Sequence, residues 1–333
     1  LNLIDALKKF AKKTNRTNSR DLDIDKISKV DPDFYQVRLP EQERYNASII
    51  LTSTNKVNVV LILLDSNGKV IAFRNNHGFN SGEGISNLTL KGGKIYNIVV
   101  IGLEKSREFN PIKDTYTLEF KTISFARDQE IEPNNNLNQA TEIMNKITKG
   151  YLSPVKDQDW YKISISSILM KAIDPNYTAI STTEQGDSDR RPDRIMSITL
   201  KGIKNIDLMF EVRDEFGGIL KKVNSKGKGK NEKLANFNVK FGKTYYIVIK
   251  GARNNLRESF TTQYQLIIKF RDRTQNEEAE PNDSSTVHIS PYNLVKLNNG
   301  ITGYLSPGYD VDYIYVNINA PGKHKFSISS VPG

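Results

Sequence analysis

Short stretches in which apolar and polar residues alternate recur along most of the chain. In the segments 116–120 and 264–270, every second residue is apolar or aromatic. A period of two is typical of a strand with one buried face. Asn67-Gly68 and Gly217-Gly218 each lie between apolar runs, which predicts hairpin turns. The pattern therefore predicts an all-β protein of antiparallel, jelly-roll-like β-sandwiches.

The segment 1–11 differs, because its apolar residues recur at helical spacing and its lysines lie mostly off that face. The apolar residues are Leu3, Ile4, Leu7, Phe10 and Ala11. This spacing predicts a short amphipathic helix. We expect the helix to cap the first sandwich. The alternative is a helix that binds a membrane surface or a partner.

An internal repeat links distant parts of the chain. The segment 91–102 (KGGKIYNIVVIG) resembles the segment 240–251 (KFGKTYYIVIKG), which lies 149 positions later. The turn that begins at Asp65 recurs at Asp214 with the same offset. The repeat predicts that one sandwich is built twice. In the second copy we expect strands near 159–165, 194–200, 206–214, 219–224, 234–240, 244–251 and 263–270.

Three further motifs occur twice, at the start of a second and a third copy. They are Glu-x-Glu-Pro-Asn at 130–134 and 278–282, Gly-Tyr-Leu-Ser-Pro at 150–154 and 303–307, and Asp-x-Asp-aromatic at 157–160 and 310–313. The first copy keeps only Asp33-Phe-Tyr35 of this set. We therefore expect an N-terminal helix and linker at 1–22, a divergent sandwich at 23–126, a second sandwich at 127–272 and an incomplete third unit at 273–333.

The second copy is longer than the first. Tyr161 and Asp214 are 53 positions apart, whereas Tyr35 and Asp65 are 30 apart. We place the inserted residues at 169–194, a largely polar stretch. Such a stretch is either a binding loop or a solvated flexible loop.

Composition and charge exclude several classes of protein. The formal net charge is +10, but the lysines and arginines are scattered and only 221–233 is a basic cluster, so we expect a solvated surface and no nucleic acid. The absence of cysteine excludes disulfides and thiolate sites, and three histidines leave little room for zinc. The longest apolar run, 59–64, is too short to cross a bilayer. No signal peptide is visible and residue 1 is Leu1, which indicates a processed or trimmed start.

No catalytic motif stands out. The chain has neither a Gly-x-Ser-x-Gly elbow nor a His-Glu-x-x-His helix. Paired acids such as Asp157 and Asp159 are the residue types of glycoside hydrolysis, but they adjoin a strand that uses them for turns or metal. We expect no enzymatic activity.

Acidic and amide residues crowd at the start of the second and third copies, although the chain is basic overall. Crowded carboxylates repel one another unless a cation is present, and calcium takes six to eight oxygen ligands. The alternative is an acidic linker followed by a turn. The candidate metal ligands are Glu130, Glu132, Asn134, Asp157 and Asp159, and then Glu278, Glu280, Asn282, Asp283, Asp310 and Asp312.

Together these motifs resemble the bacterial pre-peptidase C-terminal domain, a family that includes the collagen-binding modules of clostridial collagenases. The resemblance implies a β-sandwich, an exported protein, a non-catalytic role and calcium ligands at the positions named above. Asn135 stands where the family usually has Asp, so we expect the third unit, with Asp283, to bind calcium more tightly. The positions of the collagen-contacting aromatic residues hold Lys250 and Ala252, so we expect no collagen binding.

The resulting expectation is an exported bacterial structural or interaction protein of the cell envelope, the surface or a periplasmic appendage. Its partners would be neighbouring subunits, contacted through the insertion and the N-terminal helix. The alternatives are a secreted adhesin-like, matrix-binding or glycan-binding module, and an accessory region of a larger secreted peptidase.

Overall fold

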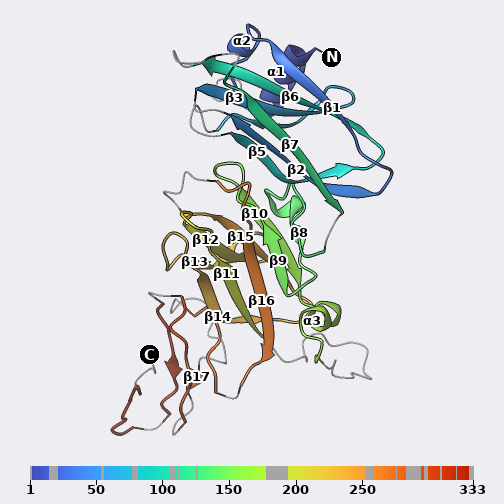
Figure 1. The fold of residues 1–333 in the computed structure, drawn as a ribbon. Helices are drawn as coiled ribbons and strands as arrows, with labels where there is room; N and C mark the ends of the chain where they lie inside the picture. The colour runs from blue at the N-terminus through green and yellow to red at the C-terminus, as the bar shows by residue number, and fades with distance from the viewer. Residues whose placement is uncertain are drawn as a thin grey trace.

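The computed structural model describes residues 2–14, 22–53, 56–76, 82–105, 110, 113–124, 127–177, 194–252, 258–274, 276–282, 294–295, 299–307, 310–319 and 321–329. Strands dominate the regular structure, and strands longer than two residues pair with one another antiparallel (Figure 1). The expected all-β class is confirmed. No helix among these residues is long and apolar enough to span a membrane.

The first sandwich consists of two sheets. One has the order β1 (Pro32–Arg38), β6 (Ile95–Lys105), β3 (Val57–Asp65) and β4 (Val70–Arg74). The other has the order β5 (Glu83–Lys91), β2 (Arg44–Ser53) and β7 (Tyr116–Ser124). Their inner faces enclose a core in which Ile49, Leu61 and Ile98 are almost completely buried.

Helices α1 (Leu3–Lys13) and α2 (Ile24–Ile27) cover the outer face of the β1–β6–β3–β4 sheet. Leu7 and Ala11 are buried there against a cluster that includes Ile62 of β3. Both faces of β3 are therefore covered, which explains its unbroken apolar run. The predicted capping helix is confirmed, and its apolar face is not available to a membrane or a partner.

The second sandwich repeats this plan and adds two strands. One sheet has the order β13 (Ile219–Val223), β12 (Leu208–Arg213), β15 (Thr244–Gly251), β10 (Gln158–Ser164) and β8 (Thr141–Glu142). The other has the order β14 (Glu232–Val239), β11 (Arg194–Lys201), β16 (Tyr264–Asp272) and β9 (Ile147–Gly150). Every strand expected in this copy is present, with ends within two residues of those predicted.

The two sandwiches share irregularities of their ladders as well as their strand order. The β2–β5 register shifts between Ala47 and Ile49, and the β11–β14 register shifts between Met196 and Ile198, 149 positions later. The β3–β4 and β12–β13 ladders also shift at positions 149 apart. The strands of the two copies are therefore equivalent one by one.

The predicted insertion is only partly a loop. Its first residues belong to α3 (Ser167–Ile173), and the Ser166 side chain caps this helix by accepting a hydrogen bond from Leu169 N at 3.2 Å. Leu169, Met170 and Ile173 are buried in the core of the second sandwich. The expectation of a binding loop or a solvated flexible loop is wrong for residues 169–173, since apolar contacts hold them in the core. Residues 178–193 lie outside the described part of the chain.

The third unit is described in pieces. Its regular structure is the parallel pair β17 (Leu294–Val295) and β18 (Tyr315–Val316), near the C-terminal end in Figure 1. In the second unit, a 3-10 turn, η2 (Leu137–Gln139), precedes β8. No described sheet combines strands from both sides of residue 126 or of residue 273.

Candidate metal centre

The first Glu-x-Glu-Pro-Asn segment runs between the two sandwiches and is bonded to both. On its own side, Glu130 N donates to Lys149 O at 3.0 Å. On the other side, Thr89 N of β5 donates to Glu132 O at 3.4 Å. The segment therefore forms a parallel bridge to the edge of the preceding sandwich.

The side chain of Glu130 joins the same two bodies. Its Oε1 accepts from Asn87 Nδ2 of β5 at 3.0 Å and from Tyr151 N at 2.7 Å. Its Oε2 lies 3.1 Å from the hydroxyls of both Tyr161 and Tyr264. A Cβ atom at Gly150 would lie 2.2 Å from this Oε2, so the motif needs glycine beside the glutamate.

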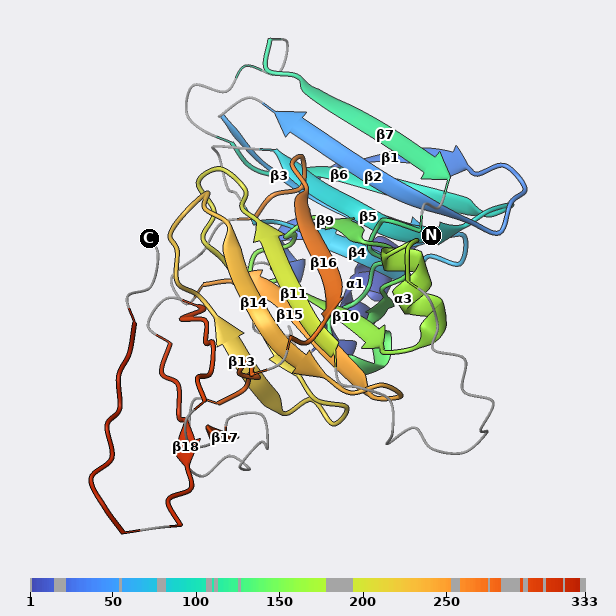
Figure 2. The ribbon, with the colours of Figure 1, turned by 90° about the horizontal axis from the view of Figure 1, so that it is seen from below.

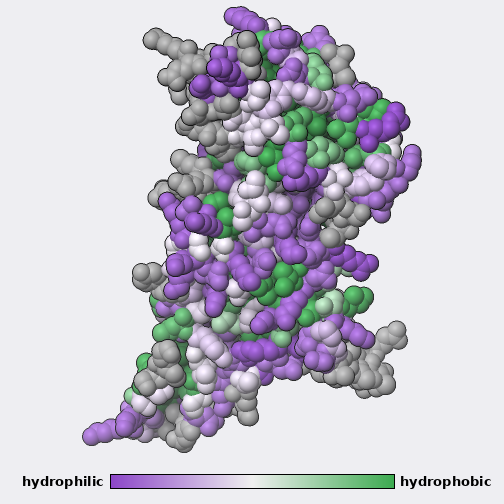
Figure 3. All heavy atoms as spheres, in the orientation of Figure 1, coloured by the Kyte–Doolittle hydropathy of each residue, from purple (hydrophilic) through white to green (hydrophobic). Residues whose placement is uncertain are grey.

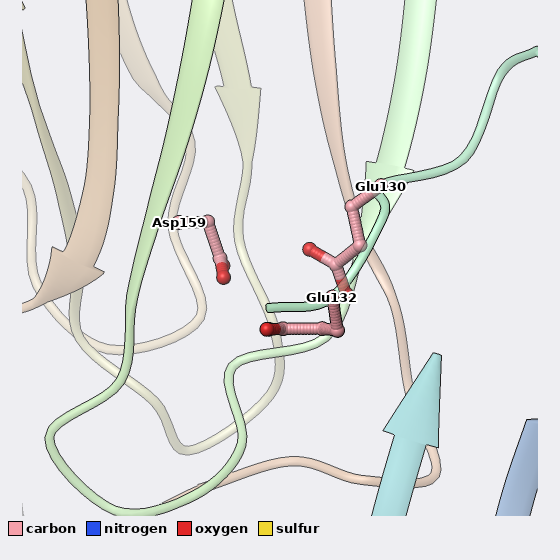
Figure 4. Close-up of side chains that lie close together, drawn as sticks. All are labelled: Glu130, Glu132 and Asp159. Atoms are coloured by element: carbon pink, nitrogen blue, oxygen red, sulfur yellow. The ribbon is translucent and has the colours of Figure 1, made fainter. Parts of the chain in front are cut away.

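Three carboxylates converge next to this contact. Oxygens of Glu130, Glu132 and Asp159 all lie within 4.8 Å of one another, and these residues are buried (Figure 4). The side-chain amide of Asn134 turns one of its two terminal atoms, oxygen or nitrogen, toward this cluster. That atom lies 3.3 Å from Glu132 Oε1 and 3.2 Å from Asp159 Oδ1. An amide nitrogen at that position would donate to both carboxylates, whereas an amide oxygen would add a fourth ligand for a cation.

Burial makes this cluster resist negative charge. It raises the pKa of Glu130 to about 7. Burial and the nearby charges of Asp157 and Glu130 raise the pKa of Glu132 to about 9, although Arg74 of β4 opposes the rise. The pKa of Asp159 is likewise raised by burial and by the neighbouring carboxylates. The site is therefore stable with protons or with a cation, and unfavourable as bare carboxylates.

Asp157 lies beside the cluster and has a local role. It accepts from Ser153 N at 2.9 Å and from Gln158 N at 3.0 Å, and so closes the turn before β10. Asn135 is exposed to solvent. Of the five candidates in the second unit, the structure brings four together and uses Asp157 for the turn.

The second acidic cluster contains an ammonium group. Oxygens of Glu280, Asp310 and Asp312 lie within 4.8 Å of one another. The buried Lys221 of β13 donates to Glu280 Oε1 at 3.0 Å and to Asp310 Oδ1 at 2.7 Å. The preceding sandwich therefore supplies a positive charge to this cluster.

Glu278 repeats the contacts of Glu130. Its Oε1 accepts from Asn236 Nδ2 of β14 at 2.8 Å and from Tyr304 N at 2.5 Å. Burial raises the pKa of Glu278 to about 7. Asn282 donates to Glu278 at 3.2 Å, while its own oxygen has no hydrogen-bond partner among the described residues. Asp283 lies outside the described residues.

Several of these contacts were missed in the sequence. Asn87 and Asn236 stand 149 positions apart in the equivalent segments 83–91 and 232–240, so the repeat offset marked them. Lys221 carried no such signal, because the first copy has Ala72 at the position 149 residues earlier. Tyr161 and Tyr264 occupy apolar positions of alternating strands, so the sequence indicated only core packing for them.

No family model matches the chain, and the search of curated proteins finds no match either. Among solved structures, the chain is similar to the pre-peptidase C-terminal domain of a collagenase from Bacillus anthracis, with 18% identity over 39% of this chain and 94% of that chain and a TM-score of 0.26. It is also similar to the CUB1-EGF-CUB2 domains of human MASP-1/3, with 8% identity over 72% of this chain and 94% of that chain and a TM-score of 0.19. A third similar structure holds the M60 catalytic domain with two CBM51 domains from Clostridium perfringens, with 10% identity over 73% of this chain and 34% of that chain and a TM-score of 0.21. The assignment to the all-β class rests on the chain's own sheets.

Proposed function

We propose that the chain is a non-catalytic, exported structural or interaction protein of a bacterial envelope, surface or appendage, in which successive β-sandwich units are held at fixed angles. One observation carries this proposal: the same asparagine-to-glutamate contact occurs at both junctions, between Asn87 and Glu130 and between Asn236 and Glu278. A repeated, buried and directional contact restricts the angle between neighbouring units. A stiff array of this kind suits contact with neighbouring subunits.

Calcium is the cation that the first junction fits best. Glu130, Glu132 and Asp159 present oxygens around one buried point, and the Asn134 amide would add a fourth when its oxygen faces them. Calcium accepts carboxylate and amide oxygens in flexible geometry, whereas zinc favours nitrogen and sulfur ligands. Bound calcium would offset two of the three negative charges of the carboxylates. The chain's own residues would then tie the linker to β10 on one side and to β5 on the other.

The second junction differs, because Lys221 already places a positive charge between Glu280 and Asp310. An ammonium group competes with calcium for the same oxygens. We therefore reverse the order expected from Asp283 and propose that the first junction binds calcium more tightly than the second. One oxygen of Asp312 has no hydrogen-bond partner among the described residues and could still be a calcium ligand. A second, weaker calcium site at this junction is therefore one outcome of the test.

The acidic pair that resembled a hydrolase site supports a non-catalytic role. Asp157 and Asp159 are 4% and 0% exposed, and both accept hydrogen bonds from the protein. A glycan has no access to such buried groups. Lys250 and Ala252 replace the aromatic residues that the family resemblance would require for collagen, so collagen is not proposed as a ligand.

Calorimetric titration of the metal-stripped protein with calcium chloride tests the proposal. We expect one tight site that is lost in Asp159→Asn and kept in the matched variant Asp312→Asn. Small-angle scattering of the same samples should show that the first two sandwiches sample a smaller range of relative angles when calcium is added. Loss of the tight site in Asp312→Asn alone, or no heat at millimolar calcium, would contradict the assignment.

A further inference from the structure

We infer that the first sandwich binds an extended segment of a partner protein along the open edge of β7, with a glutamate of that segment held by the hydroxyls of Tyr35 and Tyr116. This inference does not depend on calcium or on the junctions. It concerns the end of the array opposite the third unit.

The first sandwich lacks the two strands that complete the second. In the second sandwich, β8 pairs with β10 and β9 pairs with β16, and both added strands come from the segment 127–150. In the first sandwich, the equivalents of β10 and β16 are β1 and β7, and each is an edge strand among the described residues. Its own N-terminal segment forms α1 and α2, which cover the outer face of a sheet and leave these edges open.

The uncovered edge leaves part of the core half exposed. Tyr264, Leu266 and Ile268 of β16 are each 1% exposed. Their equivalents on β7, which are Tyr116, Leu118 and Phe120, are only partly buried. Figure 2 shows β7 at the outer margin of the molecule with β2 on one side only. Figure 3 shows apolar surface on the first sandwich where Figure 1 places β1 and β7.

A preformed group of hydroxyls lies at the end of this edge. The hydroxyls of Tyr35 and Tyr116 are 2.5 Å apart, and Tyr116 donates to Asp33 at 2.6 Å. In the second sandwich, Tyr161 and Tyr264 are also 2.5 Å apart, and Tyr264 donates to Asp159 at 2.7 Å. That second pair holds the carboxylate of Glu130 at 3.1 Å from each hydroxyl. The first pair has closely similar hydroxyl distances, and no glutamate whose side chain the structure describes contacts it.

A cavity of 590 Å³ opens beside the first pair and gives room for such a side chain. Asp33 and Tyr116 line it together with Lys29 and Lys105, and Val57 and Leu103 form part of its apolar wall. Asp31 and Asp114 also line it, and Lys56 pairs with Asp114 at 3.6 Å. Two lysines of the lining, together with Lys56 outside it, offset the charge of the three aspartates, so the surroundings of the cavity carry no net charge that would repel a single carboxylate.

We take the occupant to be a segment of another protein with the chemistry of residues 127–150, because Glu130 of that segment meets the equivalent pair of hydroxyls in the second sandwich. Glu130 and Glu278 each hold their own unit to the preceding sandwich. Addition of a strand to an open sheet edge supplies backbone hydrogen bonds, and the glutamate and the partly covered apolar residues supply selectivity. The partner segment is expected to carry a glycine opposite Tyr116, because Gly150 is required opposite Tyr264.

The test uses the full chain and a fluorescent peptide that copies residues 127–152. Fluorescence anisotropy should show saturable binding, and hydrogen exchange should show new protection of β7 amides. Binding should weaken about tenfold in the chain with Tyr116→Phe and remain unchanged with Tyr313→Phe, which removes the hydroxyl of an exposed tyrosine in the third unit. Peptides that carry Glu130→Ala or Gly150→Ala should also bind at least about tenfold more weakly, and these arms leave the protein unaltered.

Several outcomes would overturn the inference. These are absence of saturable binding, equal binding of all three peptides, and protection of β16 in place of β7. Self-association of the chain that the peptide does not displace would assign the edge to a second copy and would also contradict it.

Discussion

The side chains of Asn87 and Glu130 meet at 3.0 Å across the junction of the two complete sandwiches, and both are almost fully buried. Asn87 belongs to β5 of the first sandwich, while Glu130 belongs to the segment that introduces the second. The contact recurs between Asn236 and Glu278 at 2.8 Å. Both junctions between units therefore contain the same hydrogen bond from an asparagine to a glutamate, although the positive charge that offsets the nearby carboxylates differs.

Removal of the Asn87 amide should loosen the first junction. Asn87→Ala leaves Glu130 Oε1 with one donor fewer in a buried site, so we expect the free energy of unfolding to fall by about 1–3 kcal/mol. Differential scanning calorimetry measures this loss. The matched control is Asn135→Ala, whose side chain is exposed, and its stability should stay within about 0.5 kcal/mol of the parent. Equal effects of the two changes would count against a specific junction contact.

Lys221 should act as the built-in cation of the second junction. Lys221→Met leaves Glu280 and Asp310 buried without their ammonium partner, so we expect a loss of about 3–5 kcal/mol in metal-free buffer. Calcium should restore part of the lost free energy of unfolding in the variant. In the parent protein, calcium should add little stability through this junction. Thermal unfolding with and without calcium measures both effects. The exposed neighbour gives the control Lys222→Met, and a calcium response as large in that control would refute the idea.

The metal-free protein should lose stability as the pH rises. The folded-state pKa values of Glu130 and Glu132, about 7 and about 9, lie above those of an unfolded chain. The folded state therefore binds more protons, and its extra stability is present below about pH 4.5 and is lost as the pH rises toward about 9. Unfolding in chelator across this range measures the slope, and Glu132→Gln should flatten it. Calcium affinity should rise over the same range, because calcium displaces these protons.

Gly150 should tolerate no side chain. A Cβ atom there would lie 2.2 Å from Glu130 Oε2 and 2.3 Å from the Tyr264 hydroxyl. We expect Gly150→Ala to lower the free energy of unfolding by about 1–3 kcal/mol, because the buried glutamate must move. Gly227→Ala is the control, since a Cβ there has no atom within 4 Å. Chemical denaturation of the two variants compares them, and similar midpoints would show that Glu130 adjusts freely.

The helix α3 should be part of the core of the second sandwich. Met170→Ala removes a side chain that is 1% exposed, so we expect a loss of about 2–5 kcal/mol. Ile168 is 81% exposed, and Ile168→Ala should be almost neutral. Urea unfolding of both variants checks this difference. A neutral Met170→Ala would contradict a core role for α3 and would favour the loop that the sequence predicted over 169–194.

The pattern of the chain determined the strands, because burial of one face of a sheet imposes a period of two on the sequence. It determined the capping helix for a similar reason, since Leu3, Leu7 and Ala11 recur at helical spacing. The repeat offset of 149 reported equivalent strands, and it would also have marked Asn87 and Asn236. The paired acids showed where charge is concentrated near each junction.

Only the tertiary structure decided what lies opposite each of these groups. Periodicity reports which face of a strand is buried, but not which atom of a distant strand meets it. Lys221 and Asp310 are 89 positions apart, and no local pattern relates them. Asp157 and Asp159 look alike in the sequence, yet one closes a turn and the other joins the carboxylate cluster. The open edge of β7 likewise follows from strand order, because a missing neighbour leaves no trace in the strand that lacks it.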